Sequence, residues 1–279
     1  MYEEKYMRFP EGRAKALTFS YDDGVKADKR LLELFKKYGL KGTFNLNSLL
    51  FGVDEWHGRM DEEQTYKTFC NCQHEIGLHG ARHAFLDKVP LPEAVNEIVQ
   101  NRVYLEGKFN RIVRGFAYPY GAYSDEILNI LPQLGVTYAR TTQATNTFDV
   151  PRNFLKWNPT CHHGDPALAE LAKKFVTSSP CNEKKHREPW LFFVWGHSFE
   201  FEENGNWEII QNFARNVSGK SDIWYATNIE IYEYVQAYRS LIFSIDGERV
   251  RNSSAIPVWI ELRGKTYKIA PAQTMCFDK

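Results

Sequence analysis

Short apolar runs alternate along the chain with longer stretches in which apolar residues recur at helical spacing. The runs rich in aliphatic, aromatic and β-branched residues predict seven strands, and the stretches with a period of three to four residues predict helices. The predicted strands are 16–21, 43–46, 75–78, 115–118, 136–139, 191–195 and 223–226. The predicted helices are 31–38, 95–103, 127–134, 207–214 and 229–235, with a further helix opening at Asp165-Pro166.

This alternation predicts an α/β fold. Strands that alternate with helices pair in parallel through right-handed crossovers. Seven such units favour a distorted (β/α) barrel, and a doubly wound open sheet is the alternative. In either fold the chemistry belongs at the carboxyl ends of the strands.

The pattern changes after about residue 240. Strand-like runs at 241–244, 256–260 and 266–269 are separated by the turn pairs Asp246-Gly247 and Arg263-Gly264. We therefore predict that residues 1–240 form the barrel. Residues 241–279 would form a small antiparallel β appendage packed on the same domain.

Composition and charge narrow the class of partner. The chain has 279 residues, and its 35 Lys and Arg balance its 35 Asp and Glu. This balance argues against nucleic acid or an anionic membrane as partner. No apolar run approaches the ~18 residues of a membrane span. The sequence around Met1 lacks the apolar core of a signal peptide, and the five cysteines are irregularly spaced, so we expect a cytoplasmic location with reduced thiols.

Carboxylates and imidazoles follow two of the predicted strands. Asp22 and Asp23 end the first strand, although an ordinary turn with a helix cap explains that pair equally well. His79 and His83 follow the third strand at a spacing of four, which places both rings on one side of a helical turn. Two histidines and one aspartate make a three-ligand site with open positions, typical of catalytic Zn²⁺ and compatible with Co²⁺, Ni²⁺, Mn²⁺ or Fe²⁺.

Further histidines follow later strands. His197 comes after 191–195, where it suits general acid or base chemistry, and a core histidine is the plain alternative. The run that contains His162 and His163 is interpreted as a polar loop beside the substrate cleft, with a second metal site as the alternative.

Together these stretches resemble the polysaccharide deacetylase family, the metal-dependent carbohydrate esterases that share the chitooligosaccharide deacetylase homology domain. The family's Thr-Phe-Asp-Asp-Gly motif is represented by Thr18-Phe-Ser-Tyr-Asp22-Asp23-Gly24, and its His-(Ser/Thr)-x-x-His motif by His79-Gly-Ala-Arg-His83. Its Arg-x-Pro-Tyr motif corresponds to Ala117-Tyr-Pro119-Tyr120, and its Leu-x-His motif to the residues before His197. The resemblance spans about residues 13–240 and implies a distorted barrel.

The resemblance also implies roles for these residues. Asp23, His79 and His83 would bind one divalent metal ion, and Asp22 would be the general base that activates the attacking water. The backbone N–H of Tyr120 would help to hold the oxyanion, and His197 would protonate the leaving amine. We expect Pro119, Tyr120, Trp195 and Arg140 to line the substrate site.

Two departures from the family pattern concern supporting residues. Ala117 stands where the family has an arginine that orients the base, and Arg114, Arg140 and Arg152 are the candidates to replace it. The family's Trp and Asp beside the acid histidine have no clear match, and Trp157 and Asp149 are the candidates. Gly80 replaces a hydroxyl residue in the second motif.

These features predict a metal-dependent hydrolase that removes an acyl group, N-acetyl above all, from an amino sugar or a related small carbohydrate. One alternative is a hydrolase of another small amide, such as a cyclic ureide, an imide or a formamido sugar. The alternative from another class is a carbohydrate-binding protein without turnover. The sequence leaves the oligomeric state open.

Overall fold

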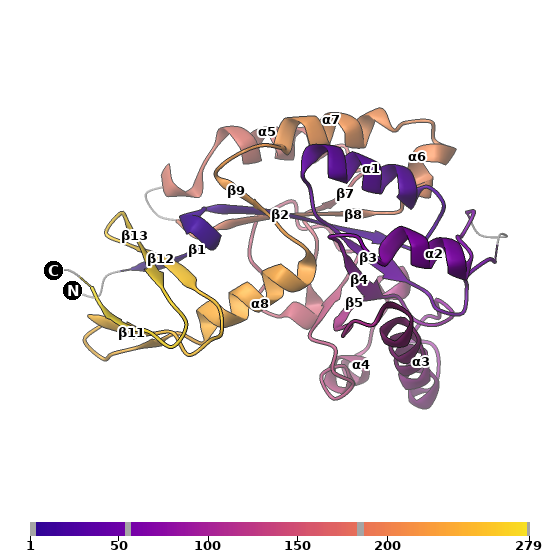
Figure 1. The fold of residues 1–279 in the computed structure, drawn as a ribbon, viewed down its shortest axis with the longest axis horizontal. Coiled ribbons are helices and arrows are strands. Elements are labelled where there is room, and N and C mark those ends of the chain that lie inside the picture. Colours follow the sequence, from indigo (N-terminus) through magenta and orange to yellow (C-terminus); the bar gives the residue numbers. More distant parts are fainter. Residues whose placement is uncertain (1–3, 54–56, 183–186, 278–279) are drawn as a thin grey trace.

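A parallel sheet of eight strands forms the centre of the computed structural model, which describes residues 4–53, 57–182 and 187–277 (Figure 1). Its strands are β2 (Lys15–Asp22), β3 (Thr43–Leu46), β4 (Glu75–Leu78), β5 (Gly115–Ala117), β6 (Tyr138–Arg140), β7 (Cys161–His162), β8 (Trp190–Gly196) and β9 (Ile223–Tyr225). The order is β6-β5-β4-β3-β2-β8-β7, and β9 pairs with β2. The predicted α/β class is confirmed. The sequence pattern missed β7 because two residues are too few to show a period.

Strand β2 is the longest strand of the sheet and lies at its centre. Along Lys15–Tyr21 it pairs with β8 on one side. On the other side, β9 pairs with its first half and β3 with its second half. All eight of its residues are buried, which explains why its sequence shows an almost continuous apolar run rather than an alternating one.

A chain segment narrows the gap between the two ends of this sheet. Trp157 forms a parallel bridge with Arg140 of β6, and its N–H donates to the carbonyl of Ala139 at 3.0 Å. Three residues later, the backbone N–H of Thr160 donates to the carbonyl oxygen of Phe193 in β8 at 2.8 Å. One segment therefore bonds to both sides of the gap, which gives the sheet the form of a distorted half-barrel.

The helices cover the outside of the sheet. They are α1 (Asp28–Tyr38), α2 (Glu62–Phe69), α3 (Leu91–Phe109), α4 (Asp125–Ile130), α5 (Leu168–Thr177), α6 (Phe199–Glu203), α7 (Glu208–Val217) and α8 (Asn228–Arg239). Helix α7 packs against both α1 and α5 on one face (Figure 1). Ser124 caps α4 with its side chain, and Gly39 ends α1 at a left-handed φ of 63°.

Helix prediction was less accurate elsewhere. Helix α5 begins at Leu168, because Asp165 first forms a turn in which its side chain accepts the N–H of Ala167 at 2.8 Å. Helices α2 and α6 were not predicted, since both are short and carry few apolar residues. In the described part of the chain, no helix combines the length and apolar character needed to cross a membrane.

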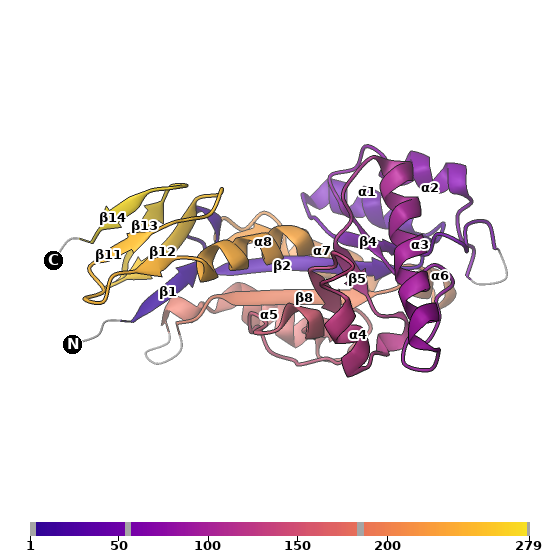
Figure 2. The same cartoon turned by 90° about the horizontal axis from the view of Figure 1, so that it is seen from below.

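Two small antiparallel sheets lie at the far end of β2 (Figure 2). The first pairs β12 (Val258–Leu262) with β13 (Lys265–Ile269) and with the N-terminal strand β1 (Lys5–Arg8). The second contains β10 (Ile242–Phe243), β11 (Arg249–Arg251) and β14 (Thr274–Cys276). The predicted turn at Arg263-Gly264 is present, with φ of 54° and 75°. The five cysteines are free.

Candidate active site

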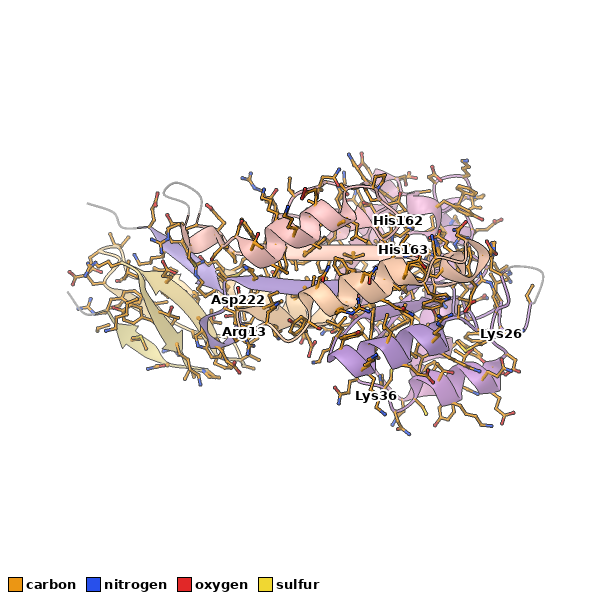
Figure 3. The ribbon with its side chains drawn as sticks, turned by 90° about the horizontal axis from the view of Figure 1, so that it is seen from above. Arg13, Lys26, Lys36, His162, His163 and Asp222 are labelled. Carbon is orange, nitrogen blue, oxygen red and sulfur yellow. The ribbon has the colours of Figure 1, made fainter. Side chains whose placement is uncertain are left out.

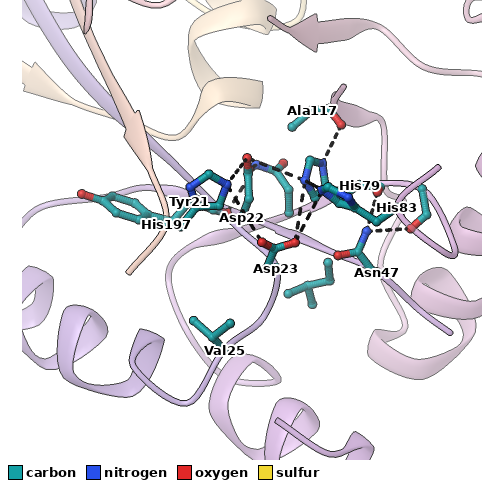
Figure 4. A network of polar contacts seen from close by, with 12 residues as sticks. Tyr21, Asp22, Asp23, Val25, Asn47, His79, His83, Ala117 and His197 are labelled. Atoms are coloured by element: carbon teal, nitrogen blue, oxygen red, sulfur yellow. Dashed lines mark hydrogen bonds and ion pairs between the residues drawn. The ribbon is translucent and has the colours of Figure 1, made fainter. Parts of the chain in front are cut away.

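The end of β2 presents two carboxylates to one small region (Figure 4). Asp22 is the last residue of the strand, and Asp23 follows in the left-handed conformation with a φ of 84°. Aspartate tolerates this conformation better than most residues. The Arg59 guanidinium holds Asp23 in place: Nη1 donates to the backbone oxygen at 2.7 Å, and Nη2 donates to Oδ1 at 2.9 Å.

The two histidines that follow β4 face Asp23. His79 Nδ1 lies 2.8 Å from the carbonyl oxygen of Ala117, so this nitrogen carries the proton and Nε2 keeps its lone pair. His83 Nε2 lies 3.0 Å from His79 Nε2. The Oδ1 atom of Asp23 lies 3.9 Å from the first Nε2 and 3.8 Å from the second.

This triangle fits one divalent ion. Ligands at 2.0–2.1 Å around a tetrahedral ion lie about 3.3 Å apart, which is close to the three separations. Burial lowers the pKa of His83 to about 3, so its ring is neutral and able to ligate. Its Nδ1 is buried with no partner among the described residues. Asp23, His79 and His83 therefore fit the metal role that the sequence suggested for them.

Asp22 is bound by partners outside that triangle, although its Oδ2 also lies 3.7 Å from His79 Nε2. Asn45 Nδ2 donates to its Oδ1 at 2.8 Å, and Arg140 Nη2 donates to its Oδ2. Burial raises the pKa of Asp22, but the charge of Arg140, the nearby imidazoles and the hydrogen bond from Asn45 together outweigh burial and hold that pKa well below its usual range. The Asp22 carboxylate is thus ionised and bound by Arg140 and Asn45, whereas the Asp23 carboxylate is the one that lies close to both His79 and His83.

Of the three candidate arginines, Arg140 is the one that contacts Asp22 and so replaces the arginine missing at Ala117. It comes from the end of β6, is fully buried, and donates from Nε to Ser20 at 3.1 Å. Its guanidinium lies 4.4 Å from the ring centre of Trp195. Arg114 instead pairs with Glu233 on the outside of the barrel.

His197 lies across the carboxylates from the metal triangle (Figure 4). Its Nε2 is 3.9 Å from Asp22 Oδ2 and 4.0 Å from Asp23 Oδ2, and its Nδ1 is 3.0 Å from Glu200 Oε1. Burial lowers the pKa of His197, but the hydrogen bond to Glu200 and the two aspartates outweigh burial and raise it. A protonated ring facing the cleft is suited to donate a proton.

Glu200 is the partner of His197 that sequence reasoning missed. The spacing of three residues from His197 was the available signal. The candidates suggested instead were wrong. Asp149 accepts from Thr147 on an exposed loop, and Trp157 packs in the core against Tyr138 and Phe193.

The predicted substrate residues surround the same region. Tyr120 has a φ of 57°, is 46% exposed, and stacks on Phe85 with ring centres 3.7 Å apart. Its ring also meets the edge of His83 at 4.4 Å. Pro119, buried, precedes it, and Trp195 lies 5.7 Å from the ring of His197. The structure thus brings Tyr120 to the metal side and Trp195 to the opposite side.

The loop between the two histidines is supported without a hydroxyl residue. Gly80 has a φ of 71°, a conformation that glycine adopts at little cost. Asn47 Nδ2 donates to the carbonyl of Gly80 at 3.0 Å, and Glu97 accepts the N–H of Arg82 at 2.6 Å. Side chains from outside the motif therefore replace the missing hydroxyl group.

A groove of about 1010 Å³ lies elsewhere, between the start of β8, the segment 145–160 and the end of α8. This groove is not lined by Asp22, Asp23, His79, His83 or His197. The convergence of titratable groups therefore identifies the candidate site, and cavity size does not.

Comparisons with known proteins find one family model and several solved structures. Residues 9–139 match the model of the polysaccharide deacetylase family. A search of curated proteins finds no match. Among solved structures, the chain resembles a putative polysaccharide deacetylase from Mycobacterium smegmatis, with 16% identity, a TM-score of 0.58, and coverage of 86% of this chain and 96% of that one.

Two further structures are similar. A family 4 carbohydrate esterase from Streptomyces lividans, solved with acetate, shows 12% identity, a TM-score of 0.50, and coverage of 77% of this chain and 93% of that one. The deacetylase PplD from Streptococcus pyogenes shows 21% identity and a TM-score of 0.45, with 50% of this chain covered. This chain spans 61% of the length of PplD.

Proposed function

Because residues 9–139 match the model of the polysaccharide deacetylase family, we propose that the chain is a member of that family and a metal-dependent hydrolase that removes an N-acetyl group from an amino sugar in a carbohydrate. The observation that carries this proposal is the division between two adjacent carboxylates. Asp23 Oδ1 lies 3.9 Å from His79 Nε2 and 3.8 Å from His83 Nε2. Asp22 lies 3.7 Å from His79 Nε2 but is bound by Arg140 and Asn45.

The residues form two groups: a metal side, which would hold the ion, and a proton side, which would accept and donate protons. A divalent ion held by Asp23, His79 and His83 would polarise the acyl carbonyl and acidify water. Asp22, ionised because of Arg140, would accept the proton of the attacking water. As the carbon–nitrogen bond breaks, His197 Nε2 would give its proton to the leaving amine. The N–H of Tyr120 would donate to the oxyanion.

Two variants test this proposal. Acetate release is measured from N-acetylglucosamine oligomers, and metal per chain by elemental mass spectrometry. Asp22→Asn should lower turnover by roughly 10²–10⁴-fold, because it removes the base, while about one ion per chain is retained. His79→Ala should lose both the ion and the activity. Full activity of Asp22→Asn, or a wild-type chain that takes up no Zn²⁺, Co²⁺ or Ni²⁺, would overturn the proposal.

The same assay separates the alternative functions. Ring opening of a cyclic imide or ureide without acetate release would indicate hydrolysis of another small amide. Saturable sugar binding without any product would indicate a carbohydrate-binding protein that retains the fold.

A further inference from the structure

Three imidazoles converge on the single carboxylate of Glu200. His197 Nδ1 lies 3.0 Å from Oε1, while His162 Nε2 and His163 Nε2 lie 3.1 and 2.8 Å from Oε2. His162 and His163 come from the end of β7 and the residue after it, on the segment that narrows the gap of the half-barrel (Figure 3). The role proposed above for His197 uses Glu200 and leaves the other two histidines unexplained.

The hydrogen bonds of His162 identify it as a donor to Glu200. The backbone N–H of Gly164 donates to His162 Nδ1 at 3.1 Å, so this nitrogen has no proton. The proton of the neutral ring is therefore on Nε2, which points at Glu200 Oε2. A nitrogen in this state has no lone pair to offer a cation, which disfavours the interpretation of this cluster as a second metal site.

His163 is fixed by its surroundings. It is 3% exposed, and its ring stacks against those of Phe201 and Tyr21, with ring centres 4.0 and 5.7 Å away. Its backbone N–H donates to the carbonyl oxygen of Trp195 at 2.8 Å. A Cβ at Gly196 would lie 2.1 Å from His163 Nδ1, so only glycine there leaves room for the ring. Gly196, the residue before His197, thus leaves room for the ring of His163. His163 in turn contacts Glu200, the partner of His197.

We propose that His162 and His163 are positioning residues that hold Glu200 in the orientation in which it aims His197 Nε2 at the cleft. With two donors on Oε2 and one on Oε1, both oxygens are occupied and rotation of the carboxylate is opposed. The inference rests on the proposed acid role of His197, and it adds two residues that never touch the substrate.

The test compares His162→Ala with His162→Gln, because His162 is partly exposed and its replacement is tolerated better than that of His163. The Gln amide places a donor near the original Nε2. Acetate release from N-acetylglucosamine oligomers should show about a tenfold lower kcat with unchanged KM for His162→Ala, and near wild-type kcat for His162→Gln. A purely structural role would lower the melting temperature of both variants alike.

A matched control removes a similar contact from the same helix. His57 Nδ1 lies 2.6 Å from Glu203 Oε1 on α6, outside the described site. His57→Ala should leave kcat unchanged. An equal loss of kcat in His57→Ala would overturn the inference, because α6 as a whole would then be responsible.

A second readout needs no substrate, so its failure is distinguishable from failure of the proposed function. Long-range ¹H–¹⁵N spectra report the tautomer of each ring. The wild type should show a protected Nδ1–H for His197, and His162→Ala should lose this signal while His162→Gln keeps it. Retention of the signal in His162→Ala would overturn the inference. So would two Zn²⁺ ions per wild-type chain, one of them lost in His162→Ala.

Discussion

At the residue scale, the stability of the fold depends strongly on the buried ion pair between Arg140 and Asp22. Both side chains are almost fully inaccessible, at 0% and 2% exposure. A buried charge is tolerated only when a partner compensates it, so each residue depends on the other for stability as well as for orientation.

Arg140→Ala should therefore destabilise the fold by about 3–5 kcal/mol, because it leaves the Asp22 carboxylate buried and unpaired. Arg114→Ala removes a guanidinium from an exposed pair with Glu233 and should cost no more than about 1 kcal/mol. Chemical denaturation of the two variants and the wild type measures the difference. Similar midpoints for both variants would contradict the assigned dependence.

The residues that sequence reasoning found and those it missed differ in a physical way. Asp22 ends β2, Asp23 and His79 directly follow a strand, and His83 lies four residues after His79, so their positions could be predicted from the local pattern. Arg140 is 118 residues away from Asp22, and only the order of strands in the sheet brings them together. Three arginines were equally plausible from the sequence, and tertiary structure selected one.

At the scale of elements, the start of α1 contains a buried acid that has no cationic partner in the described contacts. Asp28 accepts from Ser198 Oγ at 2.6 Å and from the N–H of Val25 at 3.1 Å. Burial raises the pKa of Asp28 to about 8, so the folded chain keeps this group protonated at neutral pH. The unfolded chain releases the proton near pH 4.

At this group the native state therefore binds more protons than the unfolded chain, and the contribution of Asp28 to stability should fall as the pH rises from about 4 to about 8. The expected slope is roughly 1.4 kcal/mol per pH unit from this group. Asp28→Asn should flatten the slope, since the amide can donate to Ser198 and accept from Val25. Denaturation of chelator-treated protein at pH 5, 6.5 and 8 measures it.

Asp125→Asn is the control, because Asp125 also lies in the first turn of a helix but its side chain is 92% exposed. It should leave the pH dependence unchanged. A slope that persists in Asp28→Asn would show that another group titrates.

Elements were predictable where their pattern was long. The helices α1, α3, α7 and α8 carry clear apolar periods, and their existence followed from the sequence. The two-residue strand β7 and the short α6 carry none, yet they supply His162 and Glu200. The proton side of the site was therefore the part that sequence reasoning could not assemble.

At the scale of the whole molecule, the N-terminal strand joins the C-terminal strands to the barrel. Arg8 of β1 pairs with Glu261 of β12 at 2.9 Å, and both side chains are buried. The division into residues 1–240 and 241–279 stays a prediction, but this pairing places residues of both parts in one sheet.

Glu261→Ala should leave Arg8 buried without its carboxylate and cost about 3–5 kcal/mol. Because β1 pairs with β12 and leads along the chain into β2 of the barrel, we expect one calorimetric transition at a lower temperature. Glu11→Ala, which removes an exposed partner of Arg13, should shift it little. Two separate transitions in Glu261→Ala, with the larger one unmoved, would show that the barrel melts independently of the appendage.

The pairing of β1 with β12 also means that β1 stays unpaired during most of the synthesis of the chain. The two partners Arg8 and Glu261 are 253 positions apart, so β1 leaves the ribosome long before its partner exists. At about 5–20 residues per second the wait is roughly 13–50 s. During this interval Met7 and Phe9, which are both buried in the folded protein, are not yet fully covered by their packing partners. A pause in translation between the codons for α8 and those for β12 would prolong this exposure and favour capture by chaperones.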